Sequence, residues 1–88
     1  MDTQLLRTFV VVSQTGSVTQ AAEDLGYSQP GLTRQLRTLE RHLGCTLFVR
    51  GTRPLTLTQA GRHRLTVAEA MLGLERLLLA DGPTDATA

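Results

Sequence analysis

Three glycines divide the first half of the chain into short segments, and these breaks strongly constrain the fold. Gly16 and Gly26 each end an amphipathic stretch, and a serine, Ser17 or Ser28, follows within two residues. Glycine readily adopts the left-handed conformation that ends a helix, and a serine hydroxyl accepts a hydrogen bond from an amide of the next helix. With Gly44 as a third stop, the pattern predicts helices over residues 3–15, 17–25 and 28–43.

The second and third of these segments have the spacing of a helix-turn-helix. Ala22 is small enough to let two helices approach, Gly26 suits a sharp connection, and Leu32 stands where a buried aliphatic residue is needed. Ser17 and Gln20 have the S-x-x-Q spacing of a capping box, in which each side chain satisfies an amide of the other residue. We therefore expect the second helix to position the third.

The third segment is two-sided. Its leucines recur at the i, i+4, i+7 and i+11 positions of one narrow stripe and are Leu32, Leu36, Leu39 and Leu43. At about 100° per residue, the opposite side carries Pro30, Arg34, Arg37 and Arg41. The pattern predicts a helix that buries leucine and presents a basic face.

After the third helix the period of the sequence changes. Leu47 and Val49 alternate with polar and aromatic residues, and Leu55 and Leu57 alternate with threonines beyond a turn at 51–54. This pattern predicts a two-stranded β-hairpin, which must pack on the helices because a lone hairpin is unstable in water. The arginines at its tip are Arg50 and Arg53.

A long last helix is expected from its cap at Thr58 to about Ala80. It carries two apolar stripes, and one is enough to dock the helix on its own domain, so the other indicates a second copy of the chain as partner. One of the two stripes comprises Leu65, Ala68, Leu72 and Leu79. The predicted dimerisation stripe comprises Val67, Met71, Leu74 and Leu78.

Length and composition limit the class of protein. Eighty-eight residues with 41% apolar content suit one small globular domain, and three aromatic residues predict a mainly aliphatic core. No apolar run approaches the ~18 residues of a membrane span, no signal peptide is recognisable, and the single cysteine fits a reducing compartment. We expect a cytoplasmic protein, and we expect the polar segment 81–88 to be disordered.

An enzyme is not expected from this inventory. The soft metal ligands are His42, Cys45 and His63, and their spacing fits no zinc site. Cys45 has no evident base beside it, and the chain has no glycine-rich phosphate loop and no poised pair of carboxylates. The sequence therefore predicts no catalytic residue, no metal, no cofactor and no small-molecule ligand within this chain.

Charge is segregated along the chain and points to a polyanionic partner. Residues 28–64 carry seven arginines and one acid, Glu40, whereas the rest has a net charge of −5. A recognition helix presents the polar face of its N-terminal half to the major groove, where Gln pairs with adenine, Arg with guanine, and the Thr methyl group contacts thymine. The residues that this chemistry predicts to bind DNA are Ser28, Gln29, Thr33, Arg34, Arg37, Arg50 and Arg53.

Two alternatives stay open at this point. The basic face could be a solvated surface that pairs locally with Glu40. The chain could also be a winged-helix module that binds protein instead of DNA through its leucine-rich last helix.

The order of several motifs resembles the N-terminal DNA-binding domain of LysR-type transcriptional regulators. The matching runs are FVVV, SVTQAAEDL, SQPGLTRQL, LERHLG, LFVR and LTQAG. The resemblance implies a mainly α winged helix-turn-helix at 1–57 and a linker helix at 58–80 that pairs antiparallel with its partner. It also implies a bacterial homodimer that regulates transcription from double-stranded DNA with an imperfect inverted repeat.

The resemblance carries over to particular positions and has departures. Gln29, Pro30, Thr33 and Arg34 hold the groove-contacting positions of the family, and Gly31 and Thr33 replace the more usual alanine and serine. Family members also carry a long C-terminal effector-binding domain, which nothing in these 88 residues can form. The chain is then either a fragment of a longer regulator or a stand-alone short protein, and its polar tail leads us to expect a fragment.

Overall fold

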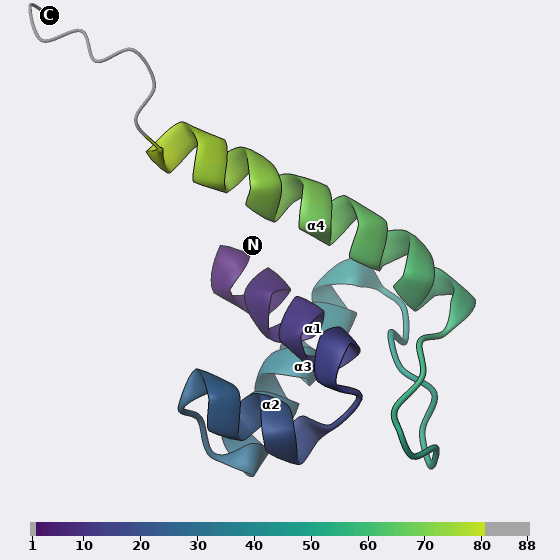
Figure 1. Cartoon of the computed structure of the whole chain (residues 1–88). Helices are drawn as coiled ribbons and strands as arrows, with labels where there is room; N and C mark the ends of the chain where they lie inside the picture. Colours follow the sequence, from purple (N-terminus) through teal and green to yellow (C-terminus); the bar gives the residue numbers. More distant parts are fainter. Residues whose placement is uncertain (1, 81–88) are drawn as a thin grey trace, which may run out of the picture.

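Four helices follow one another in the computed structural model, which describes residues 2–80. They are α1 (Thr3–Thr15), α2 (Val18–Leu25), α3 (Gln29–Leu43) and α4 (Gln59–Leu79). In Figure 1, α4 crosses above α1, with α3 behind α1 and α2 at the bottom, while the loop between α3 and α4 descends beside them. The predicted helices are confirmed, and the segment 81–88 lies outside the described residues.

The helix ends follow local capping chemistry. Gly16 and Gly26 have φ of 67° and 76°, the left-handed conformation predicted for them. Ser17 Oγ accepts a hydrogen bond from the Gln20 amide at 3.1 Å, but the other half of the predicted capping box is wrong. The Gln20 side chain donates to Asp24, because the Thr15 hydroxyl already accepts from the Ser17 amide at 3.2 Å.

The core lies between α1 and the elements around it. Phe9 is fully buried, and its ring meets that of Phe48 edge to face at a centroid distance of 5.6 Å. Apart from this aromatic pair the core is aliphatic, as the composition predicted. The other buried apolar residues are Leu6, Val12, Ala21, Ala22, Leu32, Leu36, Leu39, Leu47, Ala68 and Leu72.

The segment between α3 and α4 forms a wing, but the two β-strands of the predicted hairpin are not formed within the described residues. Only one antiparallel bridge pairs Phe48 with Leu57, flanked by a hydrogen bond from the Val49 amide to the Thr56 carbonyl. The ladder stops there because Pro54 has no amide hydrogen and the Leu55 amide donates to Gly16 instead. The predicted alternation also fails, since Leu47 and Phe48 are both buried and Val49 is exposed.

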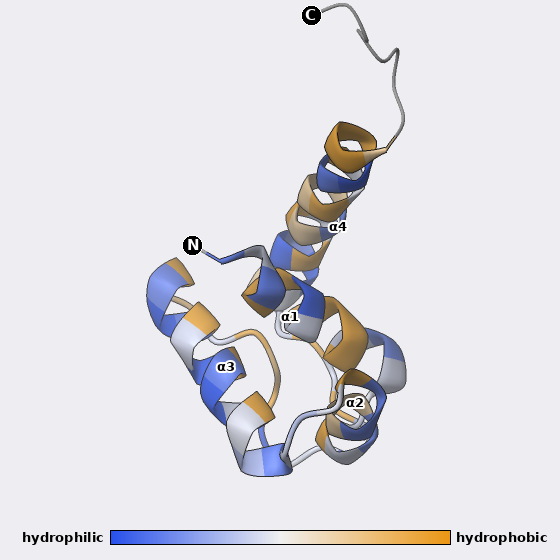
Figure 2. Ribbon diagram, turned by 90° about the vertical axis from the view of Figure 1, so that its left-hand side faces the viewer, coloured by the Kyte–Doolittle hydropathy of each residue, from blue (hydrophilic) through white to orange (hydrophobic). Residues whose placement is uncertain are grey.

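Helix α4 begins against the wing and then crosses α1. The Thr58 hydroxyl accepts from the Gly61 amide at 2.9 Å, as its predicted capping role requires. Ala68 and Leu72 are buried on the domain, whereas Leu74 and Leu78 are 65% and 83% exposed. The hydrophobic colour of α4 continues into its final turn (Figure 2), so its distal half leaves a broad apolar surface uncovered.

Candidate nucleic-acid interface

Helix α3 is oriented by its leucines and by its cap. Leu32, Leu36 and Leu39 are buried, and Leu43 packs at the edge of the core. Ser28 Oγ accepts from the Gly31 amide at 3.1 Å, and Pro30 occupies the first turn, where a missing amide hydrogen costs nothing. The predicted leucine stripe therefore faces inward and turns the polar side of α3 outward.

A polar contact that the sequence patterns did not indicate also fixes α3. Thr8 of α1 is fully buried, and its hydroxyl donates to Gln35 Oε1 at 2.6 Å. A buried hydroxyl is costly without a partner, so this bond favours one rotation of α3 about its axis. In the sequence, the only sign of this contact is Thr8 itself, a polar residue on the apolar side of the first predicted helix.

The outward side of α3 gathers most of the expected DNA-binding residues. They line one open hollow and are Gln29, Pro30, Thr33, Arg34 and Arg37. Ser28 lies beside them at the start of the helix, where its oxygen accepts the capping bond and its hydroxyl hydrogen is still able to donate. Gln, Thr and Arg together offer the donors, acceptors and methyl group with which proteins read base edges.

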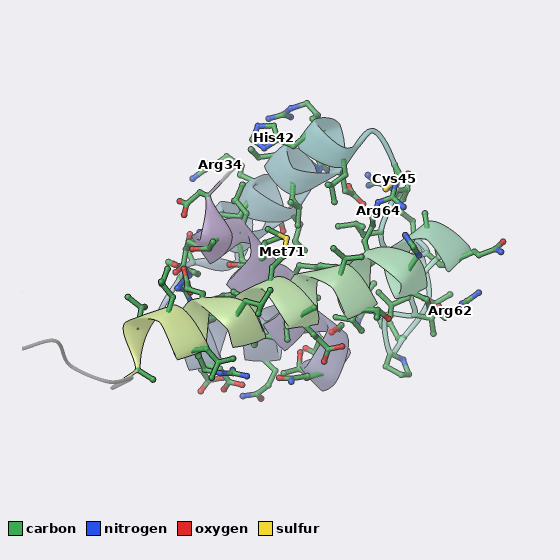
Figure 3. The ribbon with its side chains drawn as sticks, turned by 90° about the horizontal axis from the view of Figure 1, so that it is seen from above. Arg34, His42, Cys45, Arg62, Arg64 and Met71 are labelled. Atoms are coloured by element: carbon green, nitrogen blue, oxygen red, sulfur yellow. The ribbon has the colours of Figure 1, made fainter. Side chains whose placement is uncertain are left out.

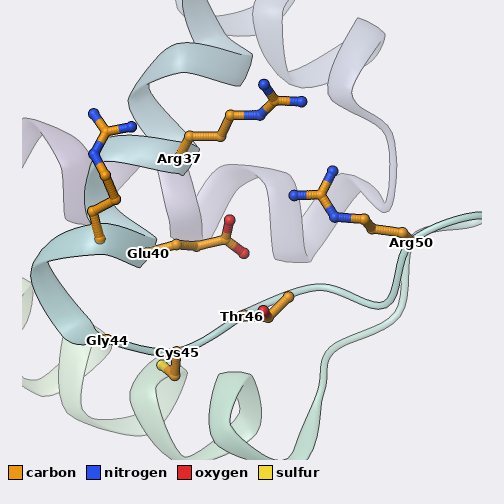
Figure 4. A pocket seen from close by; sticks show the side chains of 7 residues that line it. Arg37, Glu40, Gly44, Cys45, Thr46 and Arg50 are labelled. Carbon is orange, nitrogen blue, oxygen red and sulfur yellow. The ribbon is translucent and has the colours of Figure 1, made fainter.

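The two wing arginines lie in different places. Arg53 lines a hollow that also includes Gln29 and Ser17, between the wing tip and the first turns of α2 and α3. Arg50 instead lines a shallow depression with Arg37 and Arg41, beside the C-terminal half of α3 (Figure 4). The basic surface therefore extends from the first turn of α3 to its C-terminal half.

Glu40 lies within the second of these clusters but forms no ion pair with its arginines. Its carboxylate accepts a hydrogen bond from the Leu47 amide at 2.8 Å, which ties α3 to the wing. Among residues 2–80, the one ion pair joins Arg7 to Glu75 and involves no arginine of α3. The basic face is thus not paired locally with Glu40, contrary to the first of the two alternatives.

The histidines and the cysteine form no metal-binding cluster in the part of the chain that the structure describes. His42 and His63 are exposed on different helices, and Cys45 is half-buried beside the end of α3. Over residues 2–80, no group of three His, Cys, Asp or Glu side chains is placed to hold a metal ion. None of the helices there has the length and hydropathy needed to cross a membrane.

Two short helices, a tight turn at a left-handed glycine and a following wing define a helix-turn-helix protein with a wing. Comparison with known families agrees with this class. The model of the bacterial regulatory helix-turn-helix proteins of the lysR family matches residues 3–62. The chain therefore belongs to the lysR family, as the resemblance of its motifs predicted.

Individual relatives support the same placement. The HTH-type transcriptional regulator AbaB of Streptomyces antibioticus is 57% identical over 61 residues, which are 69% of this chain and 20% of AbaB. The BenM DBD/catB site 1 DNA complex is similar at a TM-score of 0.86 and 37% identity, covering 90% of this chain and 85% of that one. The CbnR DBD–DNA complex gives a TM-score of 0.80 and 39% identity, covering 85% of this chain and 86% of that one.

The matched region is the smaller part of these regulators. This chain spans between 20% and 26% of the length of AbaB and of two other curated relatives. The relatives are transcriptional regulators, not enzymes.

Proposed function

We propose that the chain binds double-stranded DNA sequence-specifically as a homodimer and so regulates transcription. The observation that carries this proposal is the exposed face of α3, where Gln29, Thr33 and Arg34 share one hollow. Within the described residues, no acid forms an ion pair with an arginine of α3. Burying leucine on one side of a helix so that base-reading groups project from the other suits a recognition helix. The similarity to the BenM and CbnR DNA complexes supports the same conclusion.

Within this proposal the residues of α3 and of the wing contact different parts of the DNA. Gln29, Thr33 and Arg34 lie in the first turns of α3 and read base edges in the major groove, with Ser28 and Pro30 at the same end. Arg37 and Arg41 lie further along the helix and contact phosphates, together with Arg50. Arg53 projects from the wing tip and contacts the backbone or the minor groove next to Gln29.

The dimer in this proposal forms through α4. Residues 1–57 make the DNA-binding unit and residues 58–80 the linker helix. The exposed apolar stripe consists of Val67, Met71, Leu74 and Leu78. Figure 3, which looks down onto α4, shows Arg62 and Arg64 at its N-terminal end and Met71 further along. Two such chains related by a twofold axis present two recognition helices to an imperfect inverted repeat.

Selection of bound duplexes from a random pool tests this function in one experiment. We expect the enriched duplexes to share two related half-sites in inverted orientation at a fixed spacing. Retention of no duplex at low salt would instead favour the module that binds protein through α4.

Replacing Arg34 with alanine is expected to weaken binding to the selected operator by about 1–3 kcal/mol and to relax the preference at one base position in each half-site. The reason is the loss of a bidentate contact to a guanine edge. The measurement is the affinity for the operator and for its single-base variants. Arg41→Ala is the matched control, and we expect it to weaken all these duplexes alike. If Arg34→Ala bound every variant with the wild-type pattern of preference, Arg34 would not read a base.

Replacing Arg53 with alanine is expected to weaken binding to all duplexes by a similar factor. Each lost phosphate contact lowers the slope of log K against log salt concentration by about 0.9. Titrations over a series of salt concentrations measure this slope. Arg76→Ala removes the same charge from the last turn of α4, outside the proposed interface, and should leave the slope as in the wild type. An unchanged slope in Arg53→Ala would remove the wing tip from the interface.

A further inference from the structure

Helix α4 packs on the domain over only part of its length. Its N-terminal end is held where Gly61 packs against the Leu47 backbone, and its middle rests on the domain through Ala68 and Leu72. Among the helices of the described part, only α1 lies close to α4. Hydrophobic burial is non-directional, so a polar contact further along the helix adds a directional restraint.

One polar cluster joins the distal half of α4 to the start of α1. Arg7 Nη2 lies 2.6 Å from Glu75 Oε1, and the Thr3 hydroxyl donates to Glu75 Oε2 at 2.9 Å. Arg7 is held in turn by the Thr3 hydroxyl and the Gln4 side chain, at 3.4 and 3.5 Å. Both carboxylate oxygens of Glu75 are therefore bound by α1, and these are directional, charge-assisted contacts.

Glu75 is the last residue of α4 with such an anchor in the described part of the chain. Its side chain is 25% exposed, whereas Leu77, Leu78 and Leu79 beyond it are each more than 70% exposed. The distance from Gly61 to Glu75 along the helix is roughly 21 Å at 1.5 Å per residue. A tilt of about 10° about Gly61 would move Glu75 by about 3.7 Å, which is similar to the ~3.4 Å between successive base pairs.

We propose that the cluster of Arg7, Glu75 and Thr3 sets the direction of α4 and thereby selects the half-site spacing that the dimer accepts. This inference rests on the proposed dimerisation through α4, because α4 then connects the two recognition helices. Arg7 and Glu75 act as positioning residues, since neither lies on the exposed face of α3. The phosphate and base contacts of each half-site do not depend on them.

A charge swap tests the consequence for DNA. Arg7→Glu and Glu75→Arg are compared with the double variant, in which an ion pair forms again with its charges exchanged. The measured quantity is the ratio of the affinities for the preferred spacing and for a spacing longer by one base pair. We expect this ratio to fall about threefold to fivefold in each single variant, as for the loss of a partly exposed ion pair, and to recover in the double variant. Affinity for an isolated half-site should stay unchanged in all three.

A distance measurement tests the direction of α4 without DNA. Spin labels at Glu23→Cys on α2 and Arg76→Cys on α4, in a Cys45→Ser background, report the distance within one chain when labelled protein is diluted with unlabelled protein. We expect a broader distance distribution in each single variant and the wild-type distribution in the charge swap. Unchanged distributions in the single variants would overturn the positioning role.

The two measurements separate this inference from the proposed function. A broader distribution with an unchanged spacing ratio, in variants that still dimerise, would overturn the link to half-site spacing. A wild type that sediments as a monomer would overturn the proposed dimer and the spacing role with it. The spin-label distances would then still decide whether Arg7 and Glu75 fix the direction of α4.

Discussion

Aspartate at both Leu74 and Leu78 is expected to convert the proposed dimer into a monomer. The two leucines are among the most exposed apolar side chains in the described part of the chain, and burying each in a dimer contributes about 1.5–3 kcal/mol. Because each protomer contributes both residues, the dissociation constant of the dimer should rise by about three orders of magnitude or more. Sedimentation over a range of concentrations measures this change directly.

Two other leucines of the same turn provide a matched control. Leu77 and Leu79 are 72% and 75% exposed but lie off the stripe of Val67, Met71, Leu74 and Leu78. The double variant Leu77→Asp with Leu79→Asp adds the same charge at the same end of the helix and should affect the dimer less. A dimer that persists in the Leu74/Leu78 variant, or an equal loss in both variants, would place the partner surface elsewhere.

The loss of the dimer should also reduce operator affinity without changing base preference. A monomer keeps the exposed face of α3, with Gln29, Thr33 and Arg34, but holds only one half-site at a time. Single-half-site duplexes should therefore bind the variant as they bind the wild type. The effect of Leu74 and Leu78 on DNA binding is thus separable from that of Arg34.

Much of the helical part of this fold was predictable because its signals are local. Helix ends depend on residues within one turn, and Gly16, Gly26, Ser28 and Thr58 all occupy the caps that their chemistry favours. The inward face of α3 was predictable for the same reason, since four leucines at helical spacing leave one way to bury them.

The wing was less predictable because its partners are distant in the sequence. The Leu55 amide pairs with Gly16 and the Leu47 amide with the Glu40 carboxylate, so neither amide is available for a hairpin ladder. Alternation along one segment cannot reveal such competition. The burial of Phe48 against Phe9 follows from the same tertiary packing.

The sequence predicted that the candidate site is a basic surface, but not how the wing arginines are distributed over it. The arginine pattern placed Arg34, Arg37, Arg50 and Arg53 on one basic surface. The structure divides them, with Arg53 beside Gln29 and Arg50 beside Arg37. This division depends on how the wing is fastened to α1 and α3, and no local pattern in the wing records it.

Leu47 connects the wing to both α3 and α4. Its amide donates to Glu40, its carbonyl accepts from the Thr58 amide at 2.9 Å, and its side chain is fully buried. The start of α4 lies directly against it, because a Cβ atom built on Gly61 would come within 3.0 Å of the Leu47 carbonyl carbon and closer still to its oxygen. The glycine therefore permits α3, the wing and α4 to meet.

Replacing Gly61 with alanine should for this reason lower the free energy of unfolding by about 1–3 kcal/mol, the usual cost of overpacking. Alanine favours a helix over glycine by up to ~1 kcal/mol, so the steric conflict must exceed that gain. Gly73→Ala is the matched control in the same helix: its nearest neighbour is the flexible end of Arg76 at 3.9 Å, and we expect it to stabilise the protein. Denaturant unfolding of both variants measures the difference. Equal stabilisation by the two substitutions would mean that α4 does not need its close approach to Leu47.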